Sequence, residues 1–290
     1  MAMISQVKSV IDPVIEHFFR SGRDGKSKGL GRWFAREPYR WPHHVLFIAG
    51  LPKSGTNWIA QLLASVPGYQ LRSAHDPHDC VLKHDICDGI LSRLPWHLYS
   101  VLKSHTKFNV ANLSVIEKYN LPTLVMYRDL RDQCVSNYFY ILHQPGHRHH
   151  RYYNEIPKEE GLWHCIETKL EGYRSWIQGW LPILTERPDQ FHEVRYEDLN
   201  REPNAVLTRV LDFYQIRLDP KKIASMVDHV ASKTKYDLSA NLRGRKGTAR
   251  KGIVGDWRHH FTDEQVRRFK ELCGDFLIQL GYEKDLSWGV

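Results

Sequence analysis

The sequence predicts a single α/β domain with a central, mainly parallel β-sheet flanked by helices and a P-loop-like phosphate-binding loop. Short apolar runs typical of buried strands alternate along the chain with helical patterns. A glycine-containing loop follows the first run, 45–50, and polar or cationic residues follow the later runs. Because ligands bind beyond the carboxyl ends of the strands in such sheets, these strand ends predict one binding site.

The composition is that of an ordinary globular protein. Of the 290 residues, 42% are hydrophobic and 26% charged, which allows one large domain or two small ones. The formal net charge of +8 favours anionic ligands, which include nucleotides, nucleic acids and acidic lipid headgroups. The cysteines are irregularly spaced without a CxxC pair, so we expect no disulfide framework and a reducing compartment. The sequence shows no signal-peptide core and no apolar run of transmembrane length, so we expect a cytoplasmic protein without an integral membrane segment.

Two regions are expected: residues 1–31, an amphipathic helix with a flexible connector, and residues 32–290, the main domain. The apolar residues of the stretch 4–19 fall on one helical face. This face could pack on the domain itself, on a partner subunit or on a membrane surface. Glycines among polar and basic residues at 21–31 predict the connector.

The loop after the first strand predicts an anion site. The run 45–50 predicts a buried strand, and the apolar pattern from Trp58 onwards predicts a helix. Backbone amides of residues 53–57 can converge on an anion at the positive end of that helix. Lys53 adds a full charge, and Thr56 and Asn57 add side-chain donors.

Two further strands bring cations to the same edge of the predicted sheet. Residues 96–103 predict a strand that ends at Lys103-Ser104-His105, and residues 123–127 predict one that is followed by Arg128. The segment 69–87 is polar and loop-like. Its histidines and cysteines match no zinc spacing, so we expect an irregular segment near a ligand and no metal site.

Helical patterns and one more strand complete the predicted domain. Helices are expected at 112–119, from an N-cap at Asp129 to 142, in a tryptophan-rich stretch after 160, and at 204–214, 220–230 and 262–280. A fourth strand at 191–195 leads into Tyr196, and the segment 241–256 is basic and contains glycines. The histidine- and arginine-rich segment 143–160 predicts a loop, either solvated or in contact with an anionic or aromatic molecule.

The phosphate loop differs from the Walker A pattern GxxxxGK[ST] of P-loop kinases. Its glycine spacing fits, but Thr56 stands where that pattern has lysine, and Lys53 precedes the second glycine, Gly55. The third strand ends in Arg128 rather than in an acidic Mg²⁺ ligand, which such kinases use. A nucleotide or small-molecule kinase is therefore an alternative hypothesis. A basic nucleic-acid-binding protein is another, although it does not explain the cations at the strand ends.

Three segments, 51–58 (LPKSGTNW), 127–136 (YRDLRDQCVS) and 250–257 (RKGIVGDW), resemble motifs of one family. They are similar to the 5′-phosphosulfate loop, the 3′-phosphate motif and the C-terminal signature of the cytosolic sulfotransferases, in the family's order. The resemblance extends over nearly the whole chain. It implies a sulfotransferase fold and an enzyme that uses 3′-phosphoadenosine-5′-phosphosulfate (PAPS) and releases PAP, without a metal.

The resemblance also implies which residues bind the nucleotide. Lys53 would hold the 5′-phosphosulfate and stabilise the charge that develops on the leaving oxygen. The 5′-phosphate is expected at Ser54, Gly55, Thr56 and Asn57, of which Asn57 replaces the family's usual threonine. The 3′-phosphate is expected at Arg128, Ser136, Arg250, Lys251 and Gly252, and the adenine at Trp58, Tyr196, Thr234 and Tyr236.

The segment Lys103-Ser104-His105 is similar to the family's Lys-Thr-His, whose histidine is the general base. A neutral imidazole can take a proton from an acceptor near pH 7. The resemblance therefore implies His105 as the base, with Lys103 on the sulfuryl oxygens. The implied reaction is an in-line displacement onto a hydroxyl or amine, without a covalent enzyme intermediate.

The partner expected from the sequence is a small-molecule acceptor, not a nucleic acid. The segments 71–96 and 143–160 are expected to contact it, and their composition suits a small polar or aromatic molecule better than a long lipid. In the family's dimer motif, Asp263 and Arg267 stand in place of valine and glutamate. The sequence therefore predicts no particular oligomeric state.

Overall fold

The computed structural model of the chain describes residues 41–74, 84–94, 98–241 and 252–289, with the backbone alone for residue 73 and for 233–241. Several of the expected features lie outside these described residues. They are the N-terminal helix with its connector, most of the segment 75–87, and the basic residues 242–251.

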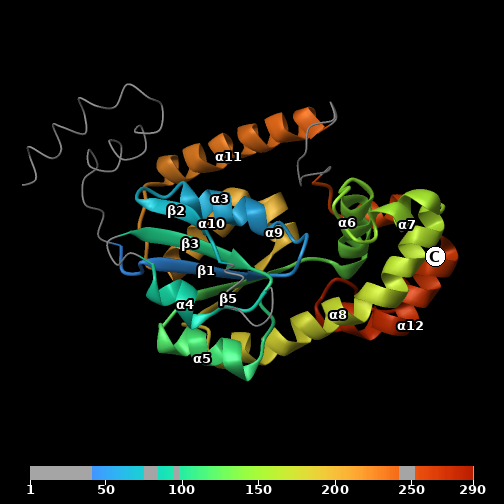
Figure 1. The fold of residues 1–290 in the computed structure, drawn as a ribbon, viewed down its shortest axis with the longest axis horizontal. Coiled ribbons are helices and arrows are strands. Elements are labelled where there is room, and N and C mark those ends of the chain that lie inside the picture. The colour runs from blue at the N-terminus through green and yellow to red at the C-terminus, as the bar shows by residue number, and fades with distance from the viewer. Residues whose placement is uncertain (1–40, 75–83, 95–97, 242–251, 290) are drawn as a thin grey trace, which may run out of the picture. The chain divides into compact units, whose positions relative to one another are not determined.

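Five parallel strands form one sheet in the order β2-β3-β1-β4-β5 (Figure 1). The strands are β1 (Val45–Gly50), β2 (Tyr69–Ser73), β3 (Tyr99–Ser104), β4 (Thr123–Tyr127) and β5 (Phe191–Arg195). After β1 the chain builds β2 and β3 on one side and then crosses to β4 on the other side. The strand order therefore reverses at β1 and β4, and ligands bind beyond the carboxyl ends of the strands at such a position.

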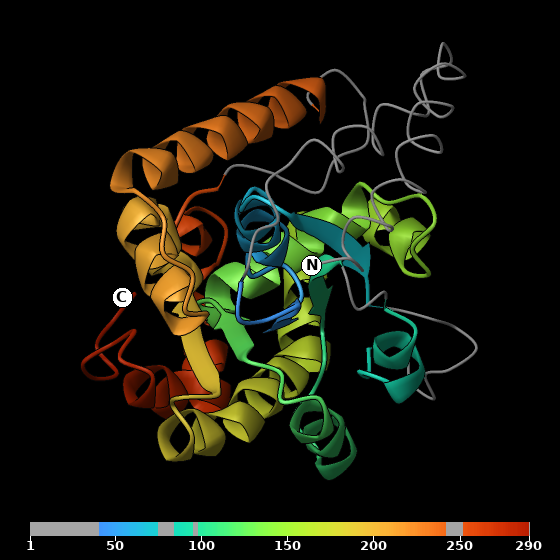
Figure 2. The ribbon, with the colours of Figure 1, turned by 90° about the vertical axis from the view of Figure 1, so that its left-hand side faces the viewer.

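Helices cover both faces of this sheet (Figures 1 and 2). One face is covered by α3 (Thr56–Ala64), α9 (Tyr196–Arg201), α10 (Pro203–Phe213) and α11 (Pro220–Asn241). The other carries α4 (Asp88–Ser92), α5 (Val110–Lys118), α6 (Leu130–Leu142), α7 (His150–Glu155), α8 (Lys158–Glu186), the 3₁₀ helix η1 (Asp256–His259) and α12 (Asp263–Gln279). The predicted α/β fold class is confirmed.

The two hydrophobic cores explain the continuous apolar run of β1. Leu46 and Ile48 pack into the core beneath α3 and α10, whereas Phe47 and Ala49 pack into the core beneath α6 and α8. Successive side chains of a strand point to opposite faces, so a strand that is covered on both sides is apolar throughout. All four residues are fully buried.

Some predicted element bounds were wrong. The expected loop at 69–87 begins with the edge strand β2, which pairs only with β3 among the described strands. Its polar residues and the 45%-exposed Leu71 weaken the apolar signal of a strand. The expected loop at 143–160 contains the short helix α7, and α11 continues to Asn241 rather than ending at residue 230.

Two further features of the described residues concern cysteines and membranes. Cys134, Cys165 and Cys273 are buried free thiols, whereas Cys87 is disulfide-bonded to a partner outside the described residues. The sequence had predicted no disulfide framework, and this single bond was not foreseen. None of the described helices is long and apolar enough to cross a membrane.

Candidate active site

The loop after β1 is closed by hydrogen bonds to itself, to β4 and to α6. The Leu51 amide donates to the Met126 carbonyl at 2.8 Å. The hydroxyl of the fully buried Ser54 lies 2.7 Å from the Leu51 carbonyl oxygen and 3.2 Å from that of Met126. The Gln133 side-chain amide donates to the Pro52 carbonyl. The Ser54 hydroxyl therefore helps to hold the loop in shape.

Two residues of this loop adopt left-handed backbone conformations. Gly55 has φ 86° and is the N-cap of α3, and a Cβ atom there would lie 2.6 Å from the Tyr196 ring. Only glycine fits this contact, which brings the Tyr196 ring against the loop. Lys53 has φ 67°, which costs a non-glycine residue about 1–2 kcal/mol. Strain of this kind is concentrated at functional sites, where the surrounding contacts enforce it.

The side chains of the loop and of the first turn of α3 differ in exposure. The Lys53 Nζ lies 4.3 Å from the centroid of the Tyr140 ring on α6. Thr56 is buried, whereas Asn57 is exposed at the first turn of α3. The rings of Trp58 and Tyr196 pack edge to face, with their centroids 6.4 Å apart. Its buried indole nitrogen has no hydrogen-bond partner among the described residues and is available to a ligand.

His105 follows β3 and is turned toward this loop. Its Nδ1 lies 2.6 Å from the carbonyl oxygen of Gly50. A carbonyl oxygen can only accept a hydrogen bond, so Nδ1 carries the proton and the neutral ring keeps a lone pair on Nε2. The Trp176 indole of α8 donates to the His105 carbonyl at 3.2 Å and so fixes the backbone. The sequence-predicted base therefore presents an unprotonated nitrogen.

Burial and neighbouring cations keep the His105 ring neutral. The pKa of His105 is lowered to about 4: burial is the largest cause, His84, Lys103 and Lys53 contribute, and the hydrogen bond to Gly50 opposes them. Burial also lowers the pKa of Lys103 at the end of β3. At neutral pH the imidazole can accept a proton. The two sequence-predicted catalytic lysines thus both act electrostatically on His105.

Arg128, directly after β4, is only 7% exposed and contacts the loop. Its Nη2 donates to Asp132 at 3.1 Å and its Nη1 to the Lys53 carbonyl at 3.5 Å. The guanidinium carbon lies 4.4 Å from the centroid of the Tyr196 ring. Its Nε is buried without a hydrogen-bond partner in the part of the chain that the structure describes. A buried charged donor in this state fits an anionic ligand.

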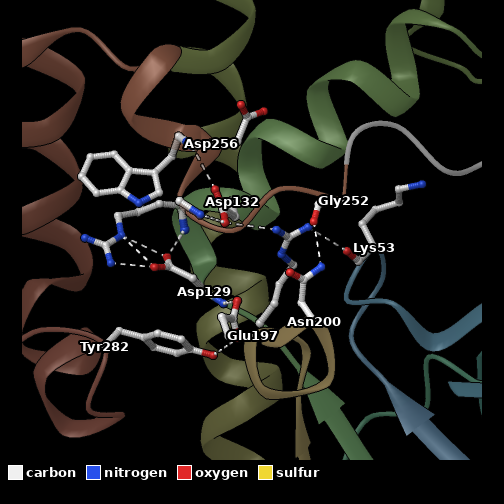
Figure 3. A network of polar contacts seen from close by, with 12 residues as sticks. Lys53, Asp129, Asp132, Glu197, Asn200, Gly252, Asp256 and Tyr282 are labelled. Carbon is white, nitrogen blue, oxygen red and sulfur yellow. Dashed lines mark hydrogen bonds and ion pairs between the residues drawn. The ribbon is translucent and has the colours of Figure 1, made fainter. Parts of the chain in front are cut away.

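Sequence reasoning missed Asp132, which joins α6 to the start of η1. Besides the Arg128 contact, its carboxylate accepts the Gly255 amide at 2.7 Å and the Trp257 amide at 3.0 Å (Figure 3). Burial raises the pKa of Asp132, and the Arg128 charge opposes that shift. The signal available in the sequence was the acid four residues after Arg128 on a helix, a spacing that brings two side chains together.

A second buried network holds the N-terminus of α6, and the sequence predicted only its N-cap. The Asp129 carboxylate caps the helix by accepting the Arg131 amide at 2.9 Å, which confirms the predicted N-cap. The Asp129 amide donates to Glu197 at 3.0 Å, and the Tyr282 hydroxyl donates to the other Glu197 oxygen at 3.0 Å. These contacts fix the direction in which α6 leaves the site.

The remaining predicted nucleotide-binding residues are described only in part. Ser136 lies on α6 one turn after Asp132 and is half-buried. Gly252 lies beside Tyr196, and the Asn200 side chain donates to its carbonyl at 2.8 Å. Outside the described residues are Arg250, Lys251 and the side chains of Thr234 and Tyr236. Within the described residues, no group of three or more His, Cys, Asp or Glu could hold a metal ion.

The chain is similar in sequence to curated sulfotransferases. The chain is 24% identical over 281 residues to flavonol 3-sulfotransferase of Flaveria bidentis, covering 87% of each chain. It is 26% identical over 248 residues to 3-beta-hydroxysteroid sulfotransferase of Cavia porcellus, covering 76% of this chain and 79% of that one.

Solved structures show the same fold. The mouse sulfotransferase SULT7A1 complexed with PAP matches with a TM-score of 0.61 and 19% identity, over 82% of this chain and 86% of that one. Retinol dehydratase in complex with retinol and PAP matches with a TM-score of 0.55 and 17% identity, over 83% and 82%. The family model of the sulfotransferase domain matches residues 43–281. The family expected from the three motifs is thus confirmed, and the chain belongs to the sulfotransferase domain family.

Proposed function

We propose that this protein transfers the sulfuryl group of PAPS to a hydroxyl or amine of a small-molecule acceptor and releases PAP. The observation that supports this most is the meeting of Lys53, His105 and Arg128 at the carboxyl ends of neighbouring strands. Relatives named for flavonols and hydroxysteroids support a small acceptor, and neighbours solved with PAP support the nucleotide.

The anionic donor fits the polar groups that the fold leaves available. Arg128 Nε and Trp58 Nε1 are buried donors without partners among the described residues. We assign Arg128, Ser136 and Gly252, with Arg250 and Lys251, to the 3′-phosphate. The 5′-phosphate goes to residues 54–57 at the N-terminus of α3, where the helix dipole favours an anion. The adenine is assigned to Trp58, Tyr196, Thr234 and Tyr236.

The transfer step needs a base on one side of the sulfur and a cation on the other. His105 Nε2 takes the acceptor proton while the acceptor oxygen or nitrogen attacks sulfur. The bond from sulfur to the 5′-phosphate oxygen breaks, and Lys53 stabilises the negative charge that develops there. Lys103 contacts the sulfuryl oxygens. Negative charge of the donor near Lys53 and Lys103 would offset their effect on His105 and raise its pKa toward neutrality, which strengthens the base.

A kinase reaction with Mg²⁺ is less well supported. Asp129 and Asp132 are the carboxylates nearest in sequence to the end of β4. Asp129 is paired with Arg131, and both oxygens of Asp132 already accept hydrogen bonds. Arg128 occupies the place where a kinase would present a metal ligand. The cationic side chains described here would neutralise the charge of the phosphates, as a metal ion does in nucleotide kinases.

We further propose a cytoplasmic protein in which residues 32–290 carry the activity and residues 1–31 are an accessory helix and connector. This division agrees with the family match at residues 43–281. The names of the relatives indicate acceptors of different chemical classes, flavonols and hydroxysteroids.

The test is label transfer to a panel of phenols and amines from sulfur-labelled PAPS or phosphorus-labelled ATP. We expect transfer from PAPS alone; transfer from ATP, or the absence of PAP binding, would refute the proposal. His105→Gln should lower kcat about 100- to 10,000-fold, the usual contribution of a general base, and leave PAP affinity within a few-fold. The matched control is His229→Gln, an exposed histidine of α11, which should retain full turnover. Near-normal turnover of His105→Gln would show that His105 is not the base.

A further inference from the structure

One buried side chain beside the loop after β1 has no role in the reaction proposed above. Gln133 lies on α6, inside the segment 127–136, and is fully buried. Its side-chain Nε2 donates a hydrogen bond to the Pro52 carbonyl. A carbonyl oxygen can only accept, so the nitrogen of the amide faces the loop. Gln133 therefore links α6 directly to the loop that carries Lys53.

The carbonyl that Gln133 holds belongs to the peptide unit that enters Lys53. Lys53 has φ 67°, a left-handed conformation that is unfavourable for a residue with a side chain. Such a conformation persists only where the surrounding contacts enforce it. The ring of Pro52 fixes its own φ, so this peptide unit turns only with the ψ of Pro52 and the φ of Lys53. A donor on the Pro52 carbonyl restrains both angles.

The peptide unit that leaves Lys53 is held as well. The Arg128 Nη1 donates to the Lys53 carbonyl in a long hydrogen bond of 3.5 Å. Arg128 is also assigned to the 3′-phosphate, so its contact with the loop is shared with a ligand. The contact from Gln133 does not depend on the nucleotide.

The other end of the Gln133 amide makes burial of this side chain costly. Its Oε1 is buried without a hydrogen-bond partner among the described residues. The neighbouring residues Leu130, Cys134 and Val135 of α6 are fully buried and apolar. An apolar side chain of similar length would avoid the cost of burying an unpaired oxygen. The bond to the loop is the contact that explains an amide at this position.

The backbone of Lys53 decides where its ammonium group lies, because φ sets the direction in which the side chain leaves the loop. In the present conformation Nζ lies 4.3 Å from the centroid of the Tyr140 ring. Its charge also contributes to the lowered pKa of His105. A displacement of about 1 Å in a reacting group can slow a reaction about 100-fold. The restraint on this backbone therefore bears on the transfer step.

We propose that Gln133 is a positioning residue for sulfuryl transfer. By holding the Pro52 carbonyl, it keeps Lys53 in the left-handed conformation that directs the ammonium group to the leaving oxygen of the donor. Gln133 contacts neither donor nor acceptor and acts through Lys53. The proposal rests on the sulfotransferase function above and adds a residue to that site.

The first test is a double-mutant cycle on turnover. Gln133→Met keeps the length of the side chain and removes the donor, and it should lower kcat about tenfold to 100-fold while PAP affinity, measured by calorimetry, stays within a few-fold. Because Gln133 acts through Lys53, Gln133→Met should lower kcat no further when it is added to Lys53→Met. Gln133→Leu, which lacks the donor but has a different shape, should behave in the same way. The control Gln265→Met removes an equally buried amide from α12 and should keep the wild-type kcat.

A second cycle needs no turnover and so separates failure of this proposal from failure of the proposed function. Glycine adopts a positive φ without a steric penalty, so Lys53→Gly should raise the urea midpoint of the otherwise unchanged protein. In Gln133→Met the backbone of Lys53 is released, and Lys53→Gly should then give no such rise. An equal rise in both backgrounds would overturn the proposal even if no acceptor is sulfated. A wild-type kcat in Gln133→Met, or the same fractional loss of kcat with and without Lys53, would overturn it as well.

Discussion

Asp132→Ala is expected to be among the most destabilising single changes near the site. The carboxylate is 2% exposed and accepts three hydrogen bonds, one from Arg128 and two from the Gly255 and Trp257 amides. Its removal leaves a buried cation and two buried N–H groups without partners. Breaking a buried ion pair on one side costs about 3–5 kcal/mol, so we expect a loss of this size in the free energy of unfolding.

Asp132→Asn should cost less, because the amide keeps one accepting oxygen. If that oxygen faces Arg128 and Gly255, only the Trp257 amide loses its acceptor, which costs about 1–3 kcal/mol. Urea denaturation followed by tryptophan fluorescence measures all of these values. The control is Asp263→Asn, an exposed acid in the first turn of α12, which should change stability by less than about 0.5 kcal/mol.

The order of the two Asp132 variants is the decisive result. Equal losses for alanine and asparagine would show that the accepting geometry is unimportant and that only the charge matters. A loss below about 1 kcal/mol for the alanine variant would contradict the idea that Asp132 holds α6 to the segment 252–257, because one ordinary hydrogen bond contributes that much.

Three further outcomes are expected. In the free protein, NMR should show no titration of His105 between pH 8 and pH 5, since its pKa is lowered to about 4; a midpoint near 6.5 would contradict the burial argument. Gly55→Ala should lower the free energy of unfolding, measured by urea denaturation, by at least about 1–2 kcal/mol because its φ is 86°. Gly172→Ala should raise it by about 0.5–1 kcal/mol, because Gly172 lies within α8 and an added methyl group there meets no other atom. Trp176→Phe removes the donor to the His105 carbonyl and should lower kcat while PAP affinity, measured by calorimetry, stays unchanged; an unaltered kcat would show that this hydrogen bond does not position the base.

Much of the fold could be predicted because its signals are local. The apolar run of β1 follows from burial on both faces, and Gly55 follows from the left-handed turn before α3. The edge strand β2 could not be predicted, because its partly exposed residues have little apolar periodicity. The helix α7 is short, and its buried Tyr153 gives too little pattern to distinguish a helix from a loop.

The sequence alone was enough to predict the strand–loop–helix unit at 45–64 and the residues that follow each strand, among them Lys53, His105 and Arg128. These features depend on near neighbours in the chain, and parallel strands bring their carboxyl ends to one edge of a sheet. The three-dimensional structure was needed to show the strand order β2-β3-β1-β4-β5, the hydrogen bond that leaves His105 Nε2 unprotonated, and the partners of Asp132. These join positions that are far apart in the sequence, and no local pattern records which distant backbone group a buried side chain will meet.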